Sequence, residues 1–261
     1  MIKKARKSEK ITAIFGEWEE TILWSCLSGM MGAVYVPEGE KVRSAMAVLG
    51  DFCFLAGEPN RELALGSSVW GKKDYMILIP QNESWEEIIA ACHQSRMKKI
   101  TRYATKKDTV FEKQKLQEAV CLLPDGCELK KMDEELFRIC LGEVWCKDLV
   151  SQFSDYRAYE RMGMGFAIVH GAEVVCGASS YSSYPGGIEV EIDTRKDWRR
   201  KNLAYICGAK LILGCLERGL YPSWDAHSRA SLALAEKLGY QFSHSYCAYE
   251  VYGEAMDCRR E

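Results

Sequence analysis

Apolar residues in the first half of the chain switch repeatedly between helical and extended spacing. Residues 17–27 carry Trp18, Ile22 and Cys26 at intervals of four, which predicts a helix. Ser84 precedes Glu86 and Glu87 in the pattern of an N-cap and an acidic first turn, and it predicts a helix over 84–94. β-branched and aromatic residues are concentrated in four other runs that we interpret as strands: 33–36, 42–49, 52–56 and 75–79.

The second half of the chain has the sharper pattern. Residues 188–194 alternate strictly between apolar and acidic or polar side chains, which predicts a strand with one buried face and one acidic face. An amphipathic helix is expected over 203–218, and Ser228 and Gly239 bracket a shorter helix as N-cap and stop signal. The other predicted elements are helices at 133–145 and 155–162, strands at 166–169, 174–180 and 222–226, and a β-rich end at 240–251.

Turn-forming residues at 122–126 separate the two halves. We therefore expect a smaller N-terminal α/β domain over 1–126 and a second domain over 127–261. Helical and extended patterns are mixed in both, which predicts an α/β fold class of the mixed α+β kind.

Composition and charge narrow the class of function. The chain has 261 residues, 48% of them hydrophobic, and a formal net charge of -2, as expected for a globular protein. A near-neutral balance argues against a protein that binds nucleic acid through phosphates. Basic clusters at 3–7 and 96–107 are interpreted as solvated faces or a frayed terminus.

Twelve cysteines are spaced in a way that argues against a zinc site. The closest pairs, Cys121 with Cys127 and Cys140 with Cys146, are six residues apart, whereas structural zinc sites use tighter pairs. We expect no metal site, and we interpret the cysteines as small buried hydrophobes in a reducing compartment. The first residues lack the apolar core of a signal peptide, and no run is long enough for a membrane helix, so a cytoplasmic location and no membrane partner are expected.

A basic loop at 195–202 lies between the alternating strand and the long helix. The first amides of a helix have no intrahelical partners, and the helix dipole favours an anion at that end. Arg199, Arg200 and Lys201 add positive charge there. A strand, a tight basic loop and a helix in this order predict a phosphate-binding site.

Two segments resemble motifs of the GNAT superfamily of N-acetyltransferases. Residues 199–204 resemble its pyrophosphate loop, which runs Arg/Gln-x-x-Gly-x-Gly/Ala, and residues 224–240 resemble its second motif, which ends in Lys-x-Gly-Phe/Tyr. The resemblance implies a GNAT fold, a twisted mixed sheet flanked by helices, and acetyl-CoA as co-substrate. It also implies contacts with acetyl-CoA from Ile192, Thr194, Arg199, Arg200, Lys201, Asn202, Leu203, Ala204, Ser228 and Ser231.

The whole-chain pattern is similar to a two-domain GNAT branch that includes a zwittermicin-resistance acetyltransferase. Residues 50–52, 188–194 and 235–239 carry this likeness. It implies acyl transfer and leaves the substrate open.

Three positions depart from the family pattern. Asn202 replaces the central glycine of the loop, and asparagine tolerates unusual backbone angles. Ser228 replaces the asparagine that opens the second motif, and it still caps a helix. Ala235 stands where many GNAT enzymes have a tyrosine general acid, so that role has no holder at this position.

The acidic face of the alternating strand supplies the candidate bases. In the chemistry that the resemblance implies, an amine attacks the acetyl thioester directly, and its ammonium form must first lose a proton. Like charges on Glu189, Glu191 and Asp193 can raise the pKa of one of them. We favour Glu191 as base or ammonium anchor, followed by Glu189, and His227 beside the second motif is the third candidate.

The sequence therefore predicts transfer of an acetyl group to a primary amine of a small molecule. The acidic strand favours a cationic substrate. Two alternatives stay open: a sensor that binds acetyl-CoA without transferring it, and an aminoacyl transferase of related fold that uses charged tRNA. No nucleic-acid partner is expected, and a homodimer stays open.

Overall fold

The computed structural model describes residues 1–39, 42–71 and 73–253, and the chain divides into two compact units. Unit 1 comprises Met1–Arg102 and the segment from Ser245 onward, and unit 2 comprises Tyr103–His244. Two strands, β6 (Met97–Thr105) and β13 (Phe242–Tyr252), have residues in both units.

These units differ from the domains expected from the sequence, 1–126 and 127–261. Residues 103–126 belong to unit 2 because α6 (Lys113–Val120) packs on α9 (Leu203–Glu217), where Leu116 and Ala119 share a core with Ile212. The segment at 122–126 is thus a turn inside unit 2. Turn residues mark a change of direction, and only packing decides to which unit a helix belongs.

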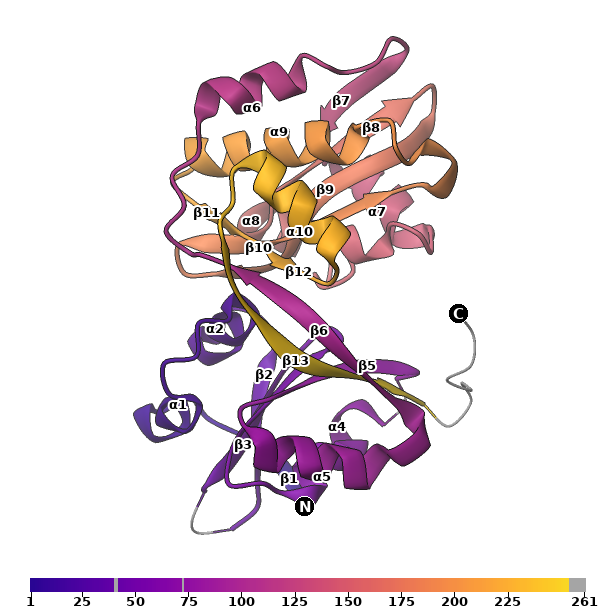
Figure 1. The fold of residues 1–261 in the computed structure, drawn as a ribbon. Coiled ribbons are helices and arrows are strands. Elements are labelled where there is room, and N and C mark those ends of the chain that lie inside the picture. The colour runs from indigo at the N-terminus through magenta and orange to yellow at the C-terminus, as the bar shows by residue number, and fades with distance from the viewer. Residues whose placement is uncertain (40–41, 72, 254–261) are drawn as a thin grey trace. The chain divides into compact units, whose positions relative to one another are not determined.

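Unit 1 is built on one sheet with helices packed against it. Its strands follow the order β1-β2-β3-β4-β5-β13-β6, and β4 and β5 are parallel (Figure 1). The face that carries Leu55 and Leu78 packs against Trp85 and Ile89 of α5. The elements not yet bounded are β1 (Ile2–Lys4), α1 (Glu9–Phe15), α2 (Thr21–Ser28), β2 (Ala33–Pro37), β3 (Ser44–Leu49), β4 (Phe52–Gly57), α3 (Arg61–Leu65), α4 (Ser67–Trp70), β5 (Tyr75–Pro80), α5 (Glu83–His93) and the 3-10 turn η1 (Gln94–Arg96).

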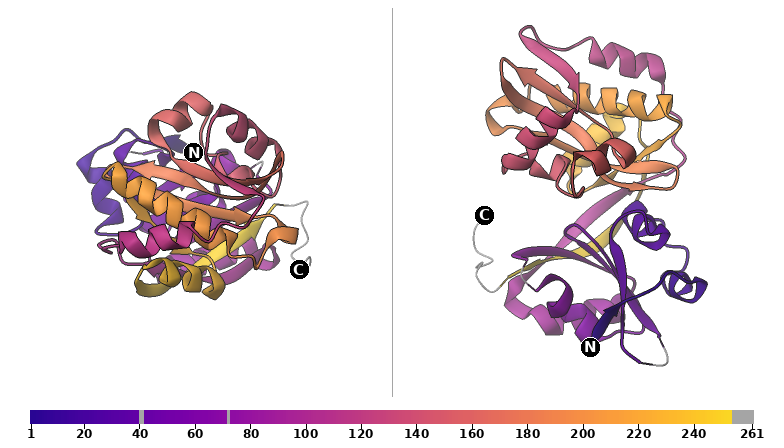
Figure 2. Two further views of the ribbon diagram at one scale, coloured as in Figure 1. Left: turned by 90° about the horizontal axis from the view of Figure 1, so that it is seen from above. Right: turned by 180° about the vertical axis from the view of Figure 1, so that it is seen from behind.

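Unit 2 contains a five-stranded sheet of order β11-β10-β9-β8-β7, in which only β10 and β11 are parallel. α9 covers one face, and both α6 and α10 pack against α9; α7 and the short turn η2 contact the other face through β9 (Figures 1 and 2). The elements are β7 (Cys127–Lys131), α7 (Glu134–Gly142), η2 (Lys147–Leu149), α8 (Tyr156–Met162), β8 (Gly165–His170), β9 (Glu173–Tyr184), β10 (Gly187–Thr194), η3 (Lys196–Trp198), β11 (Tyr221–Ser223), β12 (Asp225–Ala226) and α10 (Arg229–Leu238).

The expected mixed α/β class is confirmed, but several element boundaries moved. The N-cap of α5 is Asn82, whose side chain accepts from the Trp85 N–H, because asparagine caps as well as serine and lies two residues earlier. α2 begins at Thr21 rather than at residue 17, and α7 ends at Gly142 rather than at residue 145. The expected strand at 222–226 is split into β11 and β12.

The basic cluster at 96–107 is largely a strand, β6, in which Lys98 and Lys99 are exposed, as expected of a solvated face. Its lysines and arginines mask the alternation of apolar and polar residues by which a strand is recognised in a sequence. Arg102 is buried, and its guanidinium lies 4.9 Å from the centre of the Phe52 ring. β7 and α6 also escaped the sequence analysis, because both are short and largely polar.

Eight of the eleven cysteines in the described part of the chain are buried, and all eleven are free thiols. Burial raises the pKa of the Cys215 thiol to about 12, so it stays protonated and packs as a small apolar group.

In the described residues, no helix combines the length and apolar character needed to cross a membrane.

Candidate active site

β10 separates its side chains between the two faces of the unit 2 sheet. Ile188, Val190 and Ile192 pack with the core beneath α9. Since side chains alternate along a strand, Glu189, Glu191 and Asp193 share the opposite face, as expected from the sequence.

β10 and β11 part at Glu189. Their parallel pairing covers only Gly187–Glu189, and the next residues of the β11 chain, Asp225 and Ala226, pair with β6 instead. The Glu189 side chain lies at this fork: it is 4% exposed, and its Oε1 accepts a hydrogen bond from the backbone N–H of Asp225 at 2.8 Å. Beyond the fork, β10 from Val190 to Thr194 is paired by β9 along its other edge.

Glu191 lies two residues beyond the fork and is partly exposed. It faces Ser179 of β9, whose hydroxyl is 2.7 Å from the hydroxyl of buried Tyr159 in α8. Glu191 is therefore partly accessible to solvent, whereas Glu189 is buried at the fork.

Asp193 titrates abnormally. Burial and the negative charge of Asp148 in η2 together raise its pKa from 3.8 to about 6, burial being the larger cause, and the charge of Arg199 opposes the rise. η2 can lie this close to the sheet because β9 has a glycine there: a Cβ at Gly177 would be 2.3 Å from the Leu149 Cδ1. No pattern in the sequence points to Asp148, which is 45 residues before Asp193.

We expect Asp193→Asn to raise the free energy of unfolding by about 1–3 kcal/mol at pH 7.5. The folded protein binds the Asp193 proton more tightly than the unfolded chain does. The stability from Asp193 is thus full below pH 3.8 and lost as the pH rises through about 6. Urea titrations of both proteins at pH 4 and pH 7.5 measure this effect, and the difference should shrink at pH 4.

Asp197→Asn is the matched control, since the hydrogen bond from Arg195 lowers the pKa of that exposed carboxyl and its removal should not stabilise the fold. An equal gain from both variants, or a gain from Asp193→Asn at pH 4, would contradict the assignment.

The loop at 195–202 contains two residues with a left-handed backbone and ends at the start of α9. Arg200 has a φ of 61° and Asn202 a φ of 60°, and both values are left-handed. Arg199, which follows η3 and precedes these two residues, is extended. Asn202 is the N-cap residue of α9, with ψ of 9°, and its side chain does not cap the helix. Its Oδ1 instead accepts from Lys237 Nζ of α10 at 3.4 Å. The expectation that asparagine tolerates a positive φ here is confirmed.

The basic side chains of the loop have different roles. Arg195 forms ion pairs with Asp197 and Glu173, so it neutralises these two carboxylates and not the acidic face of β10. Arg199 donates from Nε to the Thr194 carbonyl at 3.2 Å, which closes the turn after β10. Arg199, Arg200 and Lys201 are exposed next to the first amides of α9, Leu203 and Ala204. The geometry suits a phosphate group.

α10 places the second-motif residues. Ser228 is its N-cap and accepts from the Ser231 N–H at 3.2 Å, and Ser231 Oγ accepts from the Trp224 indole at 3.2 Å. Lys237, which contacts Asn202, lies near the other end of α10, about 9 Å along the helix axis from Ser231. The structure therefore spreads the expected contacts along α10.

Ala235 and His227 have different environments. Ala235 is fully buried in the core with Leu238 and Tyr205. His227 is exposed after β12.

Residues around Glu189 that the sequence analysis missed are Ser182, Ser223 and Asp225. One signal was visible: the run 179–183 contains four serines inside a strand that is buried from Val174 to Tyr184.

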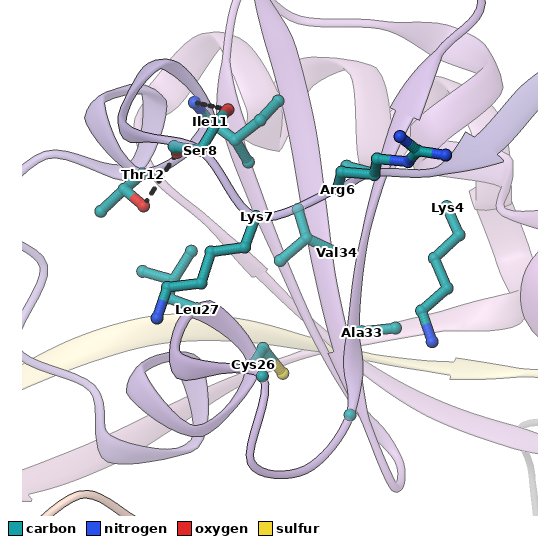
Figure 3. Close-up of a pocket in the computed structure, with 13 residues that line it drawn as sticks. Lys4, Arg6, Lys7, Ser8, Ile11, Thr12, Cys26, Leu27, Ala33 and Val34 are labelled. Carbon is teal, nitrogen blue, oxygen red and sulfur yellow. Dashed lines mark hydrogen bonds between the residues drawn. The ribbon is translucent and has the colours of Figure 1, made fainter.

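A cavity of about 200 Å³ lies within unit 1, between the segment 4–8, α2 and β2 (Figure 3). Lys7 at its wall donates to the Ser28 carbonyl at 3.3 Å, at the end of α2. Burial raises the pKa of the Cys26 thiol at its base to about 12, so this thiol is not a nucleophile.

In the described residues, no group of histidines, cysteines and carboxylates is arranged to hold a metal ion.

Comparison with known proteins gives consistent matches. A family model described as GNAT acetyltransferase matches residues 12–249. A GCN5-related N-acetyltransferase-like protein from Streptococcus suis 89/1591 is 46% identical in sequence, and its crystal structure superimposes with a TM-score of 0.89 over 93% of this chain and 97% of that chain.

Two further proteins are similar at lower identity. YdfB of Bacillus subtilis (strain 168), described as an uncharacterized N-acetyltransferase, is 29% identical over 181 residues, which are 66% of this chain and 64% of YdfB. The match thus spans less than two thirds of that relative. A putative GNAT acetyltransferase from Novosphingobium aromaticivorans DSM 12444 is 16% identical with a TM-score of 0.57, over 89% of this chain and 97% of that chain, and shares the fold.

Proposed function

The chain belongs to the GNAT acetyltransferase family, and on that premise we propose that it transfers the acetyl group of acetyl-CoA to the primary amine of a small cationic molecule. The family supports acetyl transfer in general. The donor, the amine and the residues that act on them are our proposal, and the resemblance to the zwittermicin-resistance branch stays a prediction.

The backbone at Arg200 and Asn202 carries the donor assignment. Left-handed residues at 200 and 202, the second of them directly before α9, bend the backbone around the helix start, where the free N–H groups favour an anion. The dipole of the fifteen-residue α9 and the exposed Arg199 and Lys201 add positive potential. This donor set fits the pyrophosphate of acetyl-CoA.

The fork between β10 and β11 supports the placement of the rest of the donor. Beyond Glu189, β10 turns one edge away from β11, and an extended chain can add to such an edge by main-chain hydrogen bonds. Ile192 and Thr194 would offer that edge, and Ser228 and Ser231 of α10 would lie along the same course.

The acidic face of β10 supports the amine side of the reaction. In the proposed step the nitrogen of the neutral amine forms a bond to the thioester carbonyl carbon and the C–S bond breaks. The nitrogen releases one proton to water as the amide forms, and the CoA thiolate takes one proton from water. Glu191 takes the proton from the ammonium form before attack, directly or through water. It is the carboxylate on this face that combines partial exposure with a position next to the fork. Glu189 and His227 stay the second and third candidates.

Buried Ala235 favours one other function. Since the residue at this position has no proton to give and no route to a ligand, a sensor that binds acetyl-CoA without fast turnover is the second candidate. Release of free thiol over a panel of diamines and aminoglycosides separates the two. The tRNA-dependent alternative requires no acetyl-CoA binding and is tested by the next experiment.

We expect acetyl-CoA at 100 times its Kd to raise the Tm of unit 2 by about 5–10 °C, because a ligand that binds only the folded state stabilises it by mass action. Calorimetry of the full chain measures this shift, and acetate and inorganic pyrophosphate are the controls. Pyrophosphate should give a smaller shift, and acetate none. An unchanged Tm at millimolar acetyl-CoA would exclude the proposed donor.

A further inference from the structure

Glu189 has a serine as its direct neighbour on both sides. Its partner in β9 is Ser182, and its partner in β11 is Ser223. Residues directly opposite one another in a sheet point to the same face, with Cβ atoms about 4.5–5.5 Å apart. Both hydroxyl groups therefore lie beside the Glu189 side chain.

A bulge in β9 brings Ser182 to this place. Val190 faces Ser180 and Glu189 faces Ser182, so Tyr181 is an extra residue between the two pairs. With a regular register, Tyr181 would face Glu189. Bulges of this kind re-aim side chains and are common next to active sites.

The burial of this group is nearly complete. Ser182 and Ser223 are 0% exposed, and Glu189 is 4% exposed. Among the described residues, neither serine hydroxyl has a hydrogen-bond partner. A buried hydroxyl rarely stays unpaired, and rotation about its C–O bond and χ1 lets a serine donate to any acceptor beside it. The Glu189 carboxylate is the ionisable acceptor that both serines flank.

The other polar groups near Glu189 are tyrosines and carboxylates. Burial raises the pKa of Tyr184 and of Tyr240, and the negative charge of Glu189 raises both further. Their hydroxyls donate to the carbonyls of Tyr221 and Pro222, so they are engaged elsewhere. Asp225 supplies its N–H from β12, while its carboxylate and that of Glu191 add negative charge.

We propose that Ser182 and Ser223 are positioning residues, which donate hydrogen bonds to the Glu189 carboxylate and so hold it ionised and fixed at the fork. This inference rests on the proposed function, in which Glu189 is the second candidate base, next to Glu191 on the same face of β10. The serines themselves are too deeply buried to touch the substrate.

The test is a direct titration of Glu189 in the full chain, by ¹³C NMR of labelled glutamate carboxylates with Glu189→Gln for assignment. In Ser182→Ala/Ser223→Ala, we expect the pKa of Glu189 to rise by about one unit, because hydrogen bonds to the charged form are lost. We expect the Tm to fall by about 2–4 °C.

Ser180→Ala is the matched control. Ser180 is equally buried in β9, but its hydroxyl donates to the Met164 carbonyl and accepts from the Met164 N–H. Its loss should lower the Tm and leave the Glu189 titration unchanged. Each single variant is measured as well, and Ser223→Thr, which keeps the hydroxyl, should restore the wild-type titration.

An unchanged Glu189 pKa in both single variants would overturn the inference. So would a higher Tm in the double variant, because the removal of unpaired buried hydroxyls stabilises a fold. The NMR titration needs no turnover, so a protein that acetylates no amine yet shows the pKa rise would refute the proposed function and leave the serine contacts standing.

Discussion

Replacing Glu191 with glutamine is expected to lower kcat for amine acetylation by about 10²–10⁴-fold, the usual cost of losing a general base. Glutamine has nearly the same shape and cannot take a proton. The fold and the affinity for acetyl-CoA should be kept, since Glu191 is partly exposed and lies outside the loop before α9. Steady-state rates from pH 5.5 to 9 measure the effect, and the acid limb of the profile should move or disappear.

The split between kcat and KM decides what Glu191 does. A rise in KM with kcat nearly kept would show that Glu191 only anchors a cationic amine. Glu128→Gln, on an exposed carboxylate of β7 that pairs with Lys130, is the control and should leave both constants unchanged. Wild-type rate and KM in Glu191→Gln would remove this residue from the mechanism and direct attention to Glu189 and His227.

Replacing Asn202 with valine is expected to weaken acetyl-CoA binding by about 10–30-fold. A left-handed backbone costs an ordinary L-residue about 1–2 kcal/mol, and a β-branched side chain resists it most. With φ of 60° and ψ of 9°, residue 202 opens α9, so a shift there turns the first amides of the helix away from the phosphates. Asn202→Gly relieves the same strain, and its affinity should lie within about threefold of wild type, on the tighter side.

Isothermal titration with acetyl-CoA measures all three affinities. Gln94→Val is the matched control, because Gln94 also has a positive φ, 46°, but lies in unit 1. It should lower stability without changing the affinity. Equal affinities for asparagine, glycine and valine at position 202 would show that the loop does not bind the donor in this way.

Local features of the site could be predicted from the sequence because they depend on neighbouring residues. The alternation over 188–194 specified one acidic face, and the structure has that face. Ser228 and Gly239 bracket α10 as expected, since capping involves residues within one helical turn. Asn202 at the glycine position indicated a positive φ, because few other residues accept that conformation.

Other features could not be predicted, because they depend on packing between distant segments. The abnormal pKa of Asp193 requires Asp148, which η2 brings to the sheet over Gly177. The pairing of Glu189 with Ser182 depends on a bulge, and a one-residue change of register leaves no trace in the apolar pattern of a strand that is buried on both faces.

The sequence by itself determined the order of the elements around the loop, the acidic face of β10 and the backbone demanded of residue 202. The tertiary structure alone decided that residues 103–126 belong to unit 2, that β11 leaves β10 at Glu189, and that two serines flank this carboxylate. The reason is physical: side-chain alternation and capping are set over a few residues, whereas register, burial and electrostatic coupling arise only when remote segments pack together.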